Sequence, residues 1–136
     1  MIFKCNFEVR DTEIDMDGIV SNYVYFVYLQ HARHKYLESL GCGFNTQIQN
    51  NQSPVLLATQ TNFLQSLKSQ DQFYVTCLIT SANSRIKFNC YQEIYRSSDD
   101  KLILTSTNTI TWINNNKTDP RKRFYIPETI KKQISS

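Results

Sequence analysis

The spacing of apolar residues changes period twice along the chain, from strand to helix and back to strand. Residues 2–10 alternate between polar and apolar positions, a period of two that is typical of a half-buried strand. The apolar face of this strand comprises Phe3, Cys5, Phe7 and Val9. Residues 21–40 then run without glycine or proline, and their apolar residues recur at helical spacing. The chain therefore opens with a strand and continues with a helix.

The segment 21–40 is predicted to be one long helix. Ser21 or Asn22 can cap its start, and Gly41 and Gly43 offer left-handed backbone positions that end it. One apolar stripe along the helix consists of Tyr25, Leu29, Ala32, Tyr36 and Leu40. Further apolar residues widen this surface in the first half of the helix until it is apolar on nearly every side. We therefore expect the first half to be surrounded by protein.

Everything after the polar connector at 41–53 has the pattern of strands. Strands are expected at 53–67, 72–82, 85–96 and 101–114, and the last two are joined by a hairpin turn at Ser98, Asp99 and Asp100. The basic tail, residues 115–136, is expected to be peripheral and only partly ordered. This order predicts an α+β fold in which a five-stranded antiparallel sheet wraps one long helix. Such a sheet leaves edges and apolar surface exposed, which favours a homodimer or a tetramer of two dimers.

Length and charge narrow the possible functions. A chain of 136 residues fits a single domain, which we expect to span residues 1–136. Its net charge of +3 is compatible with a phosphate-bearing ligand but is far below the basic footprint of a nucleic-acid binder. The N-terminus lacks the apolar region of a signal peptide, and no apolar run reaches the ~18–20 residues that span a bilayer.

The four cysteines contain no CxxC pair, so we expect reduced thiols in a cytoplasmic protein. The sequence contains no metal-ligand cluster, phosphate-binding loop or dinucleotide fingerprint, and no cofactor is expected.

The segment that carries chemistry is an acidic loop that leads directly into the predicted helix. Residues 15–25, DMDGIVSNYVY, resemble the D-x-x-G-x-V-x-N-x-x-Y signature of hotdog-fold acyl thioesterases of the 4-hydroxybenzoyl-CoA thioesterase family. The longer stretch at 7–38 is similar to the plant and cyanobacterial-type acyl-lipid thioesterase branch, in its R-D-x-E-x-D and Q-H-x-R-H segments. Residues 54–75 look like the strand, turn and strand of the same family. The resemblance covers about residues 3–114 and implies the hotdog fold.

The resemblance implies hydrolysis of an acyl thioester of coenzyme A or acyl carrier protein to a free acid and a thiol. By position, Asp15 matches the family's catalytic aspartate, which acts either as a nucleophile or as a general base for water. The backbone N–H near Asn22 matches the donor that polarises the thioester carbonyl. Three further motif residues, Gly18, Val20 and Tyr25, are expected around the substrate, together with Tyr23.

Elementary chemistry supports this arrangement. A helix N-terminus offers N–H donors and a partial positive charge to the oxygen of a carbonyl under attack. Asp15 lies seven residues before Asn22, and it can approach the same carbon if the loop turns back at Gly18. The other loop carboxylates are expected to be solvated or to form turns; they are Asp11, Glu13 and Asp17.

Gln30 departs from the family pattern, because many relatives carry a glutamate at this place on the helix. A glutamine cannot act as a general base, although it can orient a water molecule or the loop. His31 is the residue type best suited to acid–base work near neutral pH. Successive helix positions point about 100° apart, so Gln30 and His31 cannot both face one carbonyl.

Several other residues are candidates for substrate contacts. Thr59 and Thr61 lie where relatives place residues that line the acyl site. Arg85, Lys87 and the basic run 121–123 can meet the phosphates of coenzyme A or the acidic face of an acyl carrier protein. The aromatic residues could line either an aromatic or a fatty acyl site, so the acyl group stays open; they are Tyr23, Phe26, Tyr28 and Phe63.

Two alternative functions share the fold. A hotdog dehydratase or hydratase usually needs a histidine in the loop and a carboxylate on the helix, and this sequence has neither. A non-catalytic acyl-CoA-binding protein stays possible because of Gln30, although Asp15 and Asn22 argue against it.

Overall fold

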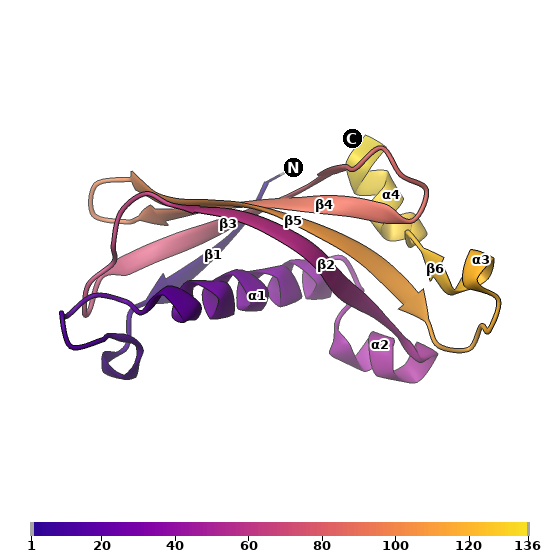
Figure 1. Cartoon of the computed structure of the whole chain (residues 1–136), viewed down its shortest axis with the longest axis horizontal. Helices are drawn as coiled ribbons and strands as arrows, with labels where there is room; N and C mark the ends of the chain where they lie inside the picture. Colours follow the sequence, from indigo (N-terminus) through magenta and orange to yellow (C-terminus); the bar gives the residue numbers. More distant parts are fainter. Residues whose placement is uncertain (1, 136) are drawn as a thin grey trace.

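A computed structural model describes residues 2–135 of the chain. The elements in chain order are β1 (Phe3–Glu8), a 3-10 turn (Asp11–Glu13), α1 (Asn22–Ser39), α2 (Phe44–Asn50), β2 (Gln52–Phe63), β3 (Gln72–Ser81), β4 (Lys87–Arg96), β5 (Lys101–Asn114), α3 (Pro120–Arg123), β6 (Phe124–Tyr125) and α4 (Glu128–Ser135). Figure 1 shows a curved sheet that lies over α1 and leaves its other side open. This is the predicted α+β layout of one long helix against an antiparallel sheet.

The strands form one antiparallel sheet in the order β1-β3-β4-β5-β2. The short strand β6 pairs with β5 in addition, so the sheet has six strands and not the predicted five. A two-residue strand carries too little periodicity to be found from sequence. Strand β2 lies at one edge of the sheet, beside β5, and β1 lies at the opposite edge.

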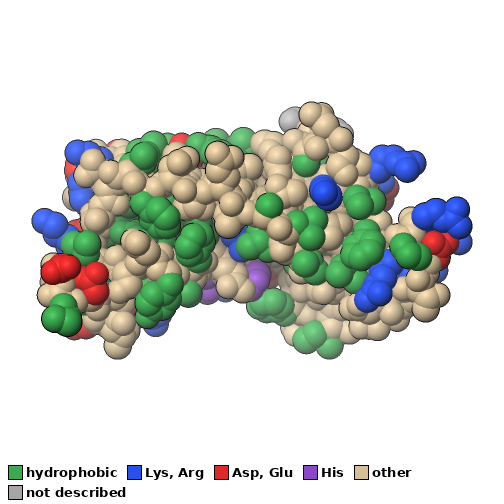
Figure 2. Space-filling view, viewed as in Figure 1, with side chains coloured by type: hydrophobic (Ala, Val, Ile, Leu, Met, Phe, Trp, Pro, Cys, Tyr) green, Lys and Arg blue, Asp and Glu red, His purple; other side chains and the backbone are tan. Residues whose placement is uncertain are grey.

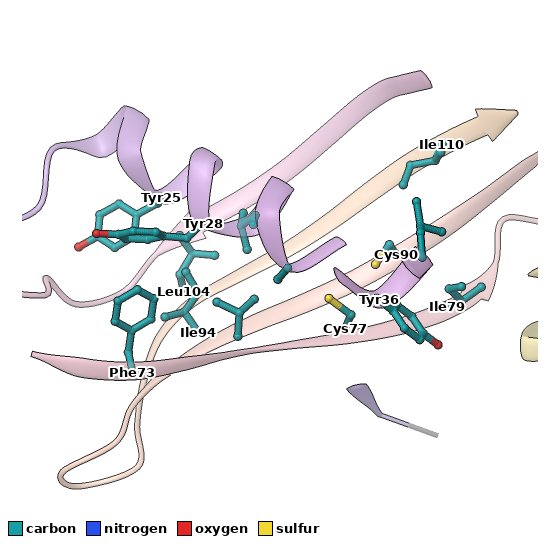
Figure 3. Close-up of a cluster of buried hydrophobic side chains, with 14 of the residues drawn as sticks. Tyr25, Tyr28, Tyr36, Phe73, Cys77, Ile79, Cys90, Ile94, Leu104 and Ile110 are labelled. Carbon is teal, nitrogen blue, oxygen red and sulfur yellow. The ribbon is translucent and has the colours of Figure 1, made fainter. Parts of the chain in front are cut away.

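The core fills the space between α1 and the concave face of the sheet. The alternation predicted for 72–82 is confirmed, because Phe73, Val75, Cys77 and Ile79 are buried. The helical stripe is confirmed as well, with Tyr25, Leu29, Ala32 and Tyr36 buried and Leu40 half-buried. Figure 3 shows the rings of Tyr25, Tyr28 and Phe73 at one end of this core and Cys90, Ile79 and Ile110 at the other.

The expectation that protein surrounds the first half of α1 is wrong for a single chain. Tyr23, Phe26 and Val27 are exposed on the side of α1 that the sheet does not cover. One sheet of this curvature can bury only one side of a helix. The exposed residues are therefore available to a second protein surface.

Two segments are more ordered than the sequence indicated. The connector at 41–53 contains α2, and Gln47 of this helix is buried. The expectation of a tail that is only partly ordered is wrong. The tail forms α3, β6 and α4, and Ile126 and Ile130 belong to the hydrophobic core. Ile130 lies in α4, and Ile126 lies in the short segment between β6 and α4.

Within residues 2–135, no helix has both the length and the apolar character needed to cross a membrane. The four cysteines are free thiols, as predicted. Over the same range no group of three or more histidine, cysteine, aspartate or glutamate side chains could hold a metal ion.

Candidate active site

The acidic loop folds back on itself before α1 begins. The N–H of Gly18 donates to the carbonyl of Asp15 (3.1 Å), and the N–H of Asp15 donates to the carbonyl of Ile19 (2.9 Å). Gly18 has a φ of +76°, a conformation that side chains other than glycine rarely adopt. An antiparallel bridge between Ile14 and Val20 closes the base of the turn. The loop therefore turns back at Gly18, as the proposed chemistry requires.

Asp15 lies at the exposed tip of this turn. Its carboxylate accepts one hydrogen bond, from the backbone N–H of Asp17 (2.9 Å). This contact holds the side chain on the turn while leaving acceptor sites of the carboxylate open to solvent.

The first turn of α1 offers N–H donors that the protein does not use. Ser21 occupies the N-cap position, but its side chain makes no capping hydrogen bond. The N–H of Val24 donates to the carbonyl of Ser21 (3.0 Å), whereas the N–H groups of Asn22 and Tyr23 meet no acceptor among residues 2–135. Both residues are exposed. A helix start with free and accessible donors is suited to hold an oxygen that carries negative charge.

Of the two outcomes expected for Glu13, the structure shows the turn and not solvation, because Glu13 belongs to the 3-10 turn and is only 8% exposed. Its carboxylate accepts hydrogen bonds from the backbone N–H of Arg10 (2.8 Å), the Arg10 guanidinium (3.0 Å) and the hydroxyl of Tyr28 on α1 (2.8 Å). Its carbonyl accepts from the N–H of Ser21 (3.2 Å). Glu13 therefore connects the segment after β1, the loop and α1 beside the free N–H groups.

These hydrogen-bond partners stabilise the negative charge of Glu13. Burial alone would raise the pKa of this carboxyl, but the N–H of Arg10, the Tyr28 hydroxyl and the Arg10 guanidinium outweigh burial and hold the pKa below its ordinary value. Burial and the hydrogen bond to Glu13 correspondingly raise the pKa of Tyr28.

Two of the four loop and helix residues expected around the substrate are buried. The Tyr25 hydroxyl accepts the N–H of Leu67 (2.9 Å), and the N–H of Val20 donates to the carbonyl of the same residue (2.9 Å). Tyr25 and Val20 are each 2% exposed. These two residues anchor the loop on the segment before β3, whereas Gly18 and Tyr23 are exposed and free to contact a ligand.

Gln30 and His31 face different cavities, as their helix spacing predicted. Gln30 lines a cavity of about 120 Å³ between the second half of α1 and the sheet, which we name the α1–sheet cavity. His31 lines a separate cavity beside the loop, together with Glu13 and Tyr28, and its ring packs edge-on against Phe7 of β1 (5.6 Å between ring centroids). The two side chains therefore cannot act on the same atom within one chain.

The α1–sheet cavity is polar on the helix side and apolar on the sheet side. The residues that line it are Gln30, Arg33, His34, Tyr36, Leu37, Pro54, Leu56, Ile79, Phe88, Cys90 and Ile110. Figure 2 shows a hollow on the open face of the molecule with histidine and basic side chains beside it. Burial lowers the pKa of His34, and the neighbouring charges of Arg33 and His31 lower it further.

A chain of hydrogen-bonded polar side chains, buried at its centre, runs from this cavity to the edge strand. Arg33 Nη1 donates to Gln92 Oε1 (3.0 Å), and Asn108 Nδ2 donates to the same oxygen (3.0 Å). Asn108 Oδ1 accepts from Thr59 Oγ1 (2.8 Å), and Thr61 and Ser106 share a further hydrogen bond (2.8 Å). Thr59 and Thr61 therefore lie on the concave face of β2, beside the open side of α1.

Sequence reasoning missed the buried members of this network. Gln92 and Asn108 are 0% and 1% exposed, and Arg33 is half-buried. The available signal was a glutamine on the otherwise apolar face of β4, with Ser106 and Asn108 between Leu104 and Ile110 on β5. Polar residues at core positions indicate a specific network when they are fully hydrogen-bonded.

The predicted basic contacts lie far from Asp15 within the chain. Arg85 and Lys87 are exposed at the β3–β4 turn, and residues 121–123 form the exposed helix α3. Figure 1 places this turn and α3 at the end of the molecule opposite the acidic loop. Basic side chains gather around α3 in Figure 2.

Within one chain, the catalytic candidates lie apart from the α1–sheet cavity. Asn22 and Arg33 are eleven residues apart on α1, which corresponds to about 16 Å along the helix axis. Asp15 and the free N–H groups form one cluster, and the cavity with the basic residues forms another.

Comparisons with known proteins agree with this architecture. A model of the thioesterase-like superfamily matches residues 9–134. A chloroplastic acyl-acyl carrier protein thioesterase of Arabidopsis thaliana is 32% identical over 109 residues, which are 79% of this chain and 56% of the relative. The chain thus spans little more than half the length of this relative.

Two solved structures show the same fold. A 1,4-dihydroxy-2-naphthoyl-CoA thioesterase of Synechocystis has a TM-score of 0.85 at 20% identity, covering 100% of this chain and 97% of its own. A Staphylococcus aureus protein solved in complex with CoA has a TM-score of 0.85 at 19% identity, covering 99% of this chain and 82% of its own. The predicted α+β hotdog fold is confirmed, and the chain belongs to the thioesterase-like superfamily.

Proposed function

We propose that the protein is an acyl thioesterase that hydrolyses an acyl-CoA or acyl-carrier-protein thioester to a free acid and a thiol. The observation that carries the proposal is the pair of free N–H groups at Asn22 and Tyr23, next to a turn that holds the Asp15 carboxylate. Membership of the thioesterase-like superfamily supports the reaction class.

In the proposed reaction, the N–H groups at the start of α1 polarise the thioester carbonyl and stabilise the oxyanion that forms. Asp15 acts as a general base, which takes a proton from the attacking water, or as a nucleophile, which forms an anhydride that water then opens. In both routes the C–S bond breaks, the thiolate leaves and takes up a proton, and water supplies the oxygen of the acid. Gln30 supplies no base in either route.

Two chains complete the site in this proposal. Strand β2 is an edge strand, and Leu56, Leu57, Phe63 and Leu64 are exposed on or beside it. Antiparallel pairing of two β2 edges about a two-fold axis brings the acidic loop of one chain toward the α1–sheet cavity of the other. This follows because β2 extends from Pro54 at the cavity to Phe63, whose ring contacts Tyr25 and Phe26 at the start of α1 (5.8 and 5.9 Å).

The same pairing of two chains would bring the exposed basic residues near the substrate. In a dimer of this kind, Arg85, Lys87 and α3 of one chain lie at the same end of the assembly as the partner's acidic loop. They are therefore placed to attract the phosphates of coenzyme A or the phosphopantetheine and acidic surface of a carrier protein. The Arabidopsis relative is named as a thioesterase of acyl carrier protein thioesters, and the Synechocystis protein as a thioesterase of a coenzyme A thioester. These names support either carrier as the substrate's thiol part.

A panel of thioesters tests the proposal. The purified protein is assayed for release of free thiol from acyl-CoA and acyl-carrier-protein thioesters of increasing length, with one aromatic member. We expect turnover of at least one member, with a rate that is proportional to enzyme concentration. Absence of hydrolysis across the whole panel would contradict the proposal.

A second candidate is a non-catalytic acyl-CoA-binding protein, which Gln30 favours because no carboxylate lines the α1–sheet cavity. Calorimetry with the same acyl-CoA panel separates the two functions. Saturable binding without thiol release would establish the binding protein and exclude the thioesterase.

A further inference from the structure

The α1–sheet cavity contains a positive charge for which the chain supplies no opposite charge. Arg33 is half-buried, and its guanidinium donates a hydrogen bond to the neutral amide oxygen of Gln92 (3.0 Å). Among residues 2–135, no aspartate or glutamate oxygen lies within 4.0 Å of Arg33. Buried charges in folded proteins are ordinarily paired, so this one calls for a partner.

The residues around Arg33 provide no opposite charge. No acidic residue lines the cavity, and the other side chains there with polar atoms are Gln30, His34, Tyr36 and Cys90. A guanidinium carries five N–H donors in a rigid plane, and Gln92 takes one of them. The remaining donors can serve a ligand in the cavity.

The guanidinium is also held in a fixed position. Gln92 Oε1 accepts from Arg33 and from Asn108, while Gln92 Nε2 donates to the carbonyl of Leu29 (3.0 Å). Gln92 is completely buried, so its amide cannot turn away. Such a fixed fork favours a planar, two-oxygen acceptor that binds through two parallel hydrogen bonds.

A plain alkyl chain fits this cavity poorly. It would shield the remaining Arg33 donors from solvent and offer them no acceptor, which is costly for a cation. The apolar walls of Leu37, Phe88 and Ile110 nevertheless exclude a fully hydrated ion. The cavity is therefore suited to a short apolar group that ends in an anion.

We propose that the α1–sheet cavity receives the end of the acyl group remote from the thioester, and that this end carries a carboxylate that pairs with Arg33. The substrates are then thioesters of dicarboxylic acids, attacked by the loop of the partner chain, and this inference rests on the proposed thioesterase function. The cavity volume of about 120 Å³ limits the enclosed part to a small group, since an apolar cavity of about 150 Å³ holds benzene.

Matched substrate pairs test the proposal with the intact protein. Butanoyl and succinyl, hexanoyl and adipoyl, and octanoyl and suberoyl thioesters differ within each pair only by the terminal carboxylate. We expect kcat/KM to be at least tenfold higher for the carboxylate member at one length or more. Equal values, or preference for the alkyl member at every length, would overturn the proposal while leaving thioester hydrolysis established.

Variants separate direct recognition from a structural contribution of Arg33. Arg33→Gln is expected to reduce the carboxylate-to-alkyl ratio of kcat/KM toward one, whereas Arg33→Lys retains part of it. Lys35→Gln removes the same charge from an exposed position on α1 and should leave the ratio unchanged. An unchanged ratio in Arg33→Gln, with both rates reduced equally, would contradict recognition. If Arg33→Gln does not fold, the matched substrate pairs measured with the wild-type protein still test the proposal.

A binding measurement keeps this inference separate from the proposed function. Adipate and hexanoate are titrated into the wild-type protein by calorimetry. At least tenfold tighter binding of adipate supports the cavity assignment even if no thioester is hydrolysed. Equal affinities, or no binding of adipate, would contradict it.

Discussion

Glu13 is buried beside the first half of α1 and Arg33 is half-buried on its second half, and the two charged side chains differ in their partners. Glu13, beside the start of the helix, receives the Arg10 backbone N–H, the Arg10 guanidinium and the Tyr28 hydroxyl. Arg33, beneath the second half of the helix, is joined to the neutral Gln92 and to no carboxylate in residues 2–135. Within this range the chain supplies a partner of opposite charge to Glu13 but not to Arg33.

This difference indicates that Glu13 contributes to stability and Arg33 to ligand binding. A buried charge whose partners all come from the chain stabilises one conformation, here the loop that presents Asp15. A buried charge without an opposite charge adds little stability and is retained where something else pairs with it. The two sites therefore predict opposite responses to mutation, which the following experiments measure.

The largest effect on stability is expected for Glu13→Ala. The substitution leaves the Tyr28 hydroxyl and the Arg10 N–H without their acceptor in a buried place, at a cost of about 2–3 kcal/mol. The free energy of unfolding in urea measures this loss, and Asp17→Ala on the exposed turn is the matched control. A loss below 0.5 kcal/mol, an order of magnitude set by ordinary surface changes, would show that Glu13 is not a structural centre.

The contribution of Glu13 should also depend on pH. Because its pKa is lowered in the folded protein, its stabilisation is present above the ordinary value of 4.5 and is lost as the pH falls through the lower folded value. The difference in unfolding free energy between wild type and Glu13→Ala should therefore shrink on acidification from neutral pH. A constant difference across this range would contradict the assigned charge interaction.

A smaller loss is expected for Tyr28→Phe. The variant keeps the buried ring against Phe73 but removes the hydroxyl that donates to Glu13, and the expected cost is about 1–2 kcal/mol. In a double-mutant cycle with Glu13→Ala the two losses should not add, because they report one hydrogen bond. Additive losses would place the two residues in independent networks.

The smallest effect on stability is expected for Arg33→Met. Removal of a half-buried cation without an opposite charge relieves its desolvation, and Gln92 Oε1 keeps the hydrogen bond from Asn108. The unfolding free energy should stay within about 1 kcal/mol of wild type or rise. A loss as large as that of Glu13→Ala would show that both charges are structural, and the contrast between them would disappear.

The sequence predicted most of the fold because its strands and long helix carry clear periods. The alternation of residues 72–82 and the stripe from Tyr25 to Tyr36 correspond directly to the buried faces. Strand β6 and helix α2 were missed because two and seven residues contain too little pattern. The tail was underestimated because its overall basic charge obscured Ile126 and Ile130, which complete the core.

The candidate site was predictable where a local motif determines it and not where distant residues meet. The turn at Gly18 and the helix start at Asn22 follow from a contiguous stretch of sequence. The burial of Glu13 depends on Tyr28, fifteen residues away, and the network of Arg33 depends on Gln92 and Asn108 from other elements. Such contacts arise from strand register and packing, which composition and spacing do not reveal.

The most direct test of the proposed chemistry is the rate of thiol release by Asp15→Asn, measured beside Asp17→Asn on the best thioester of the panel. Asp15→Asn removes the carboxylate that acts as base or nucleophile but keeps the shape of the turn. We predict a fall in kcat of about 10²–10⁴-fold for Asp15→Asn, with KM changed little, and near wild-type kinetics for Asp17→Asn. Equal rates in both variants and the wild type would contradict the assignment of Asp15.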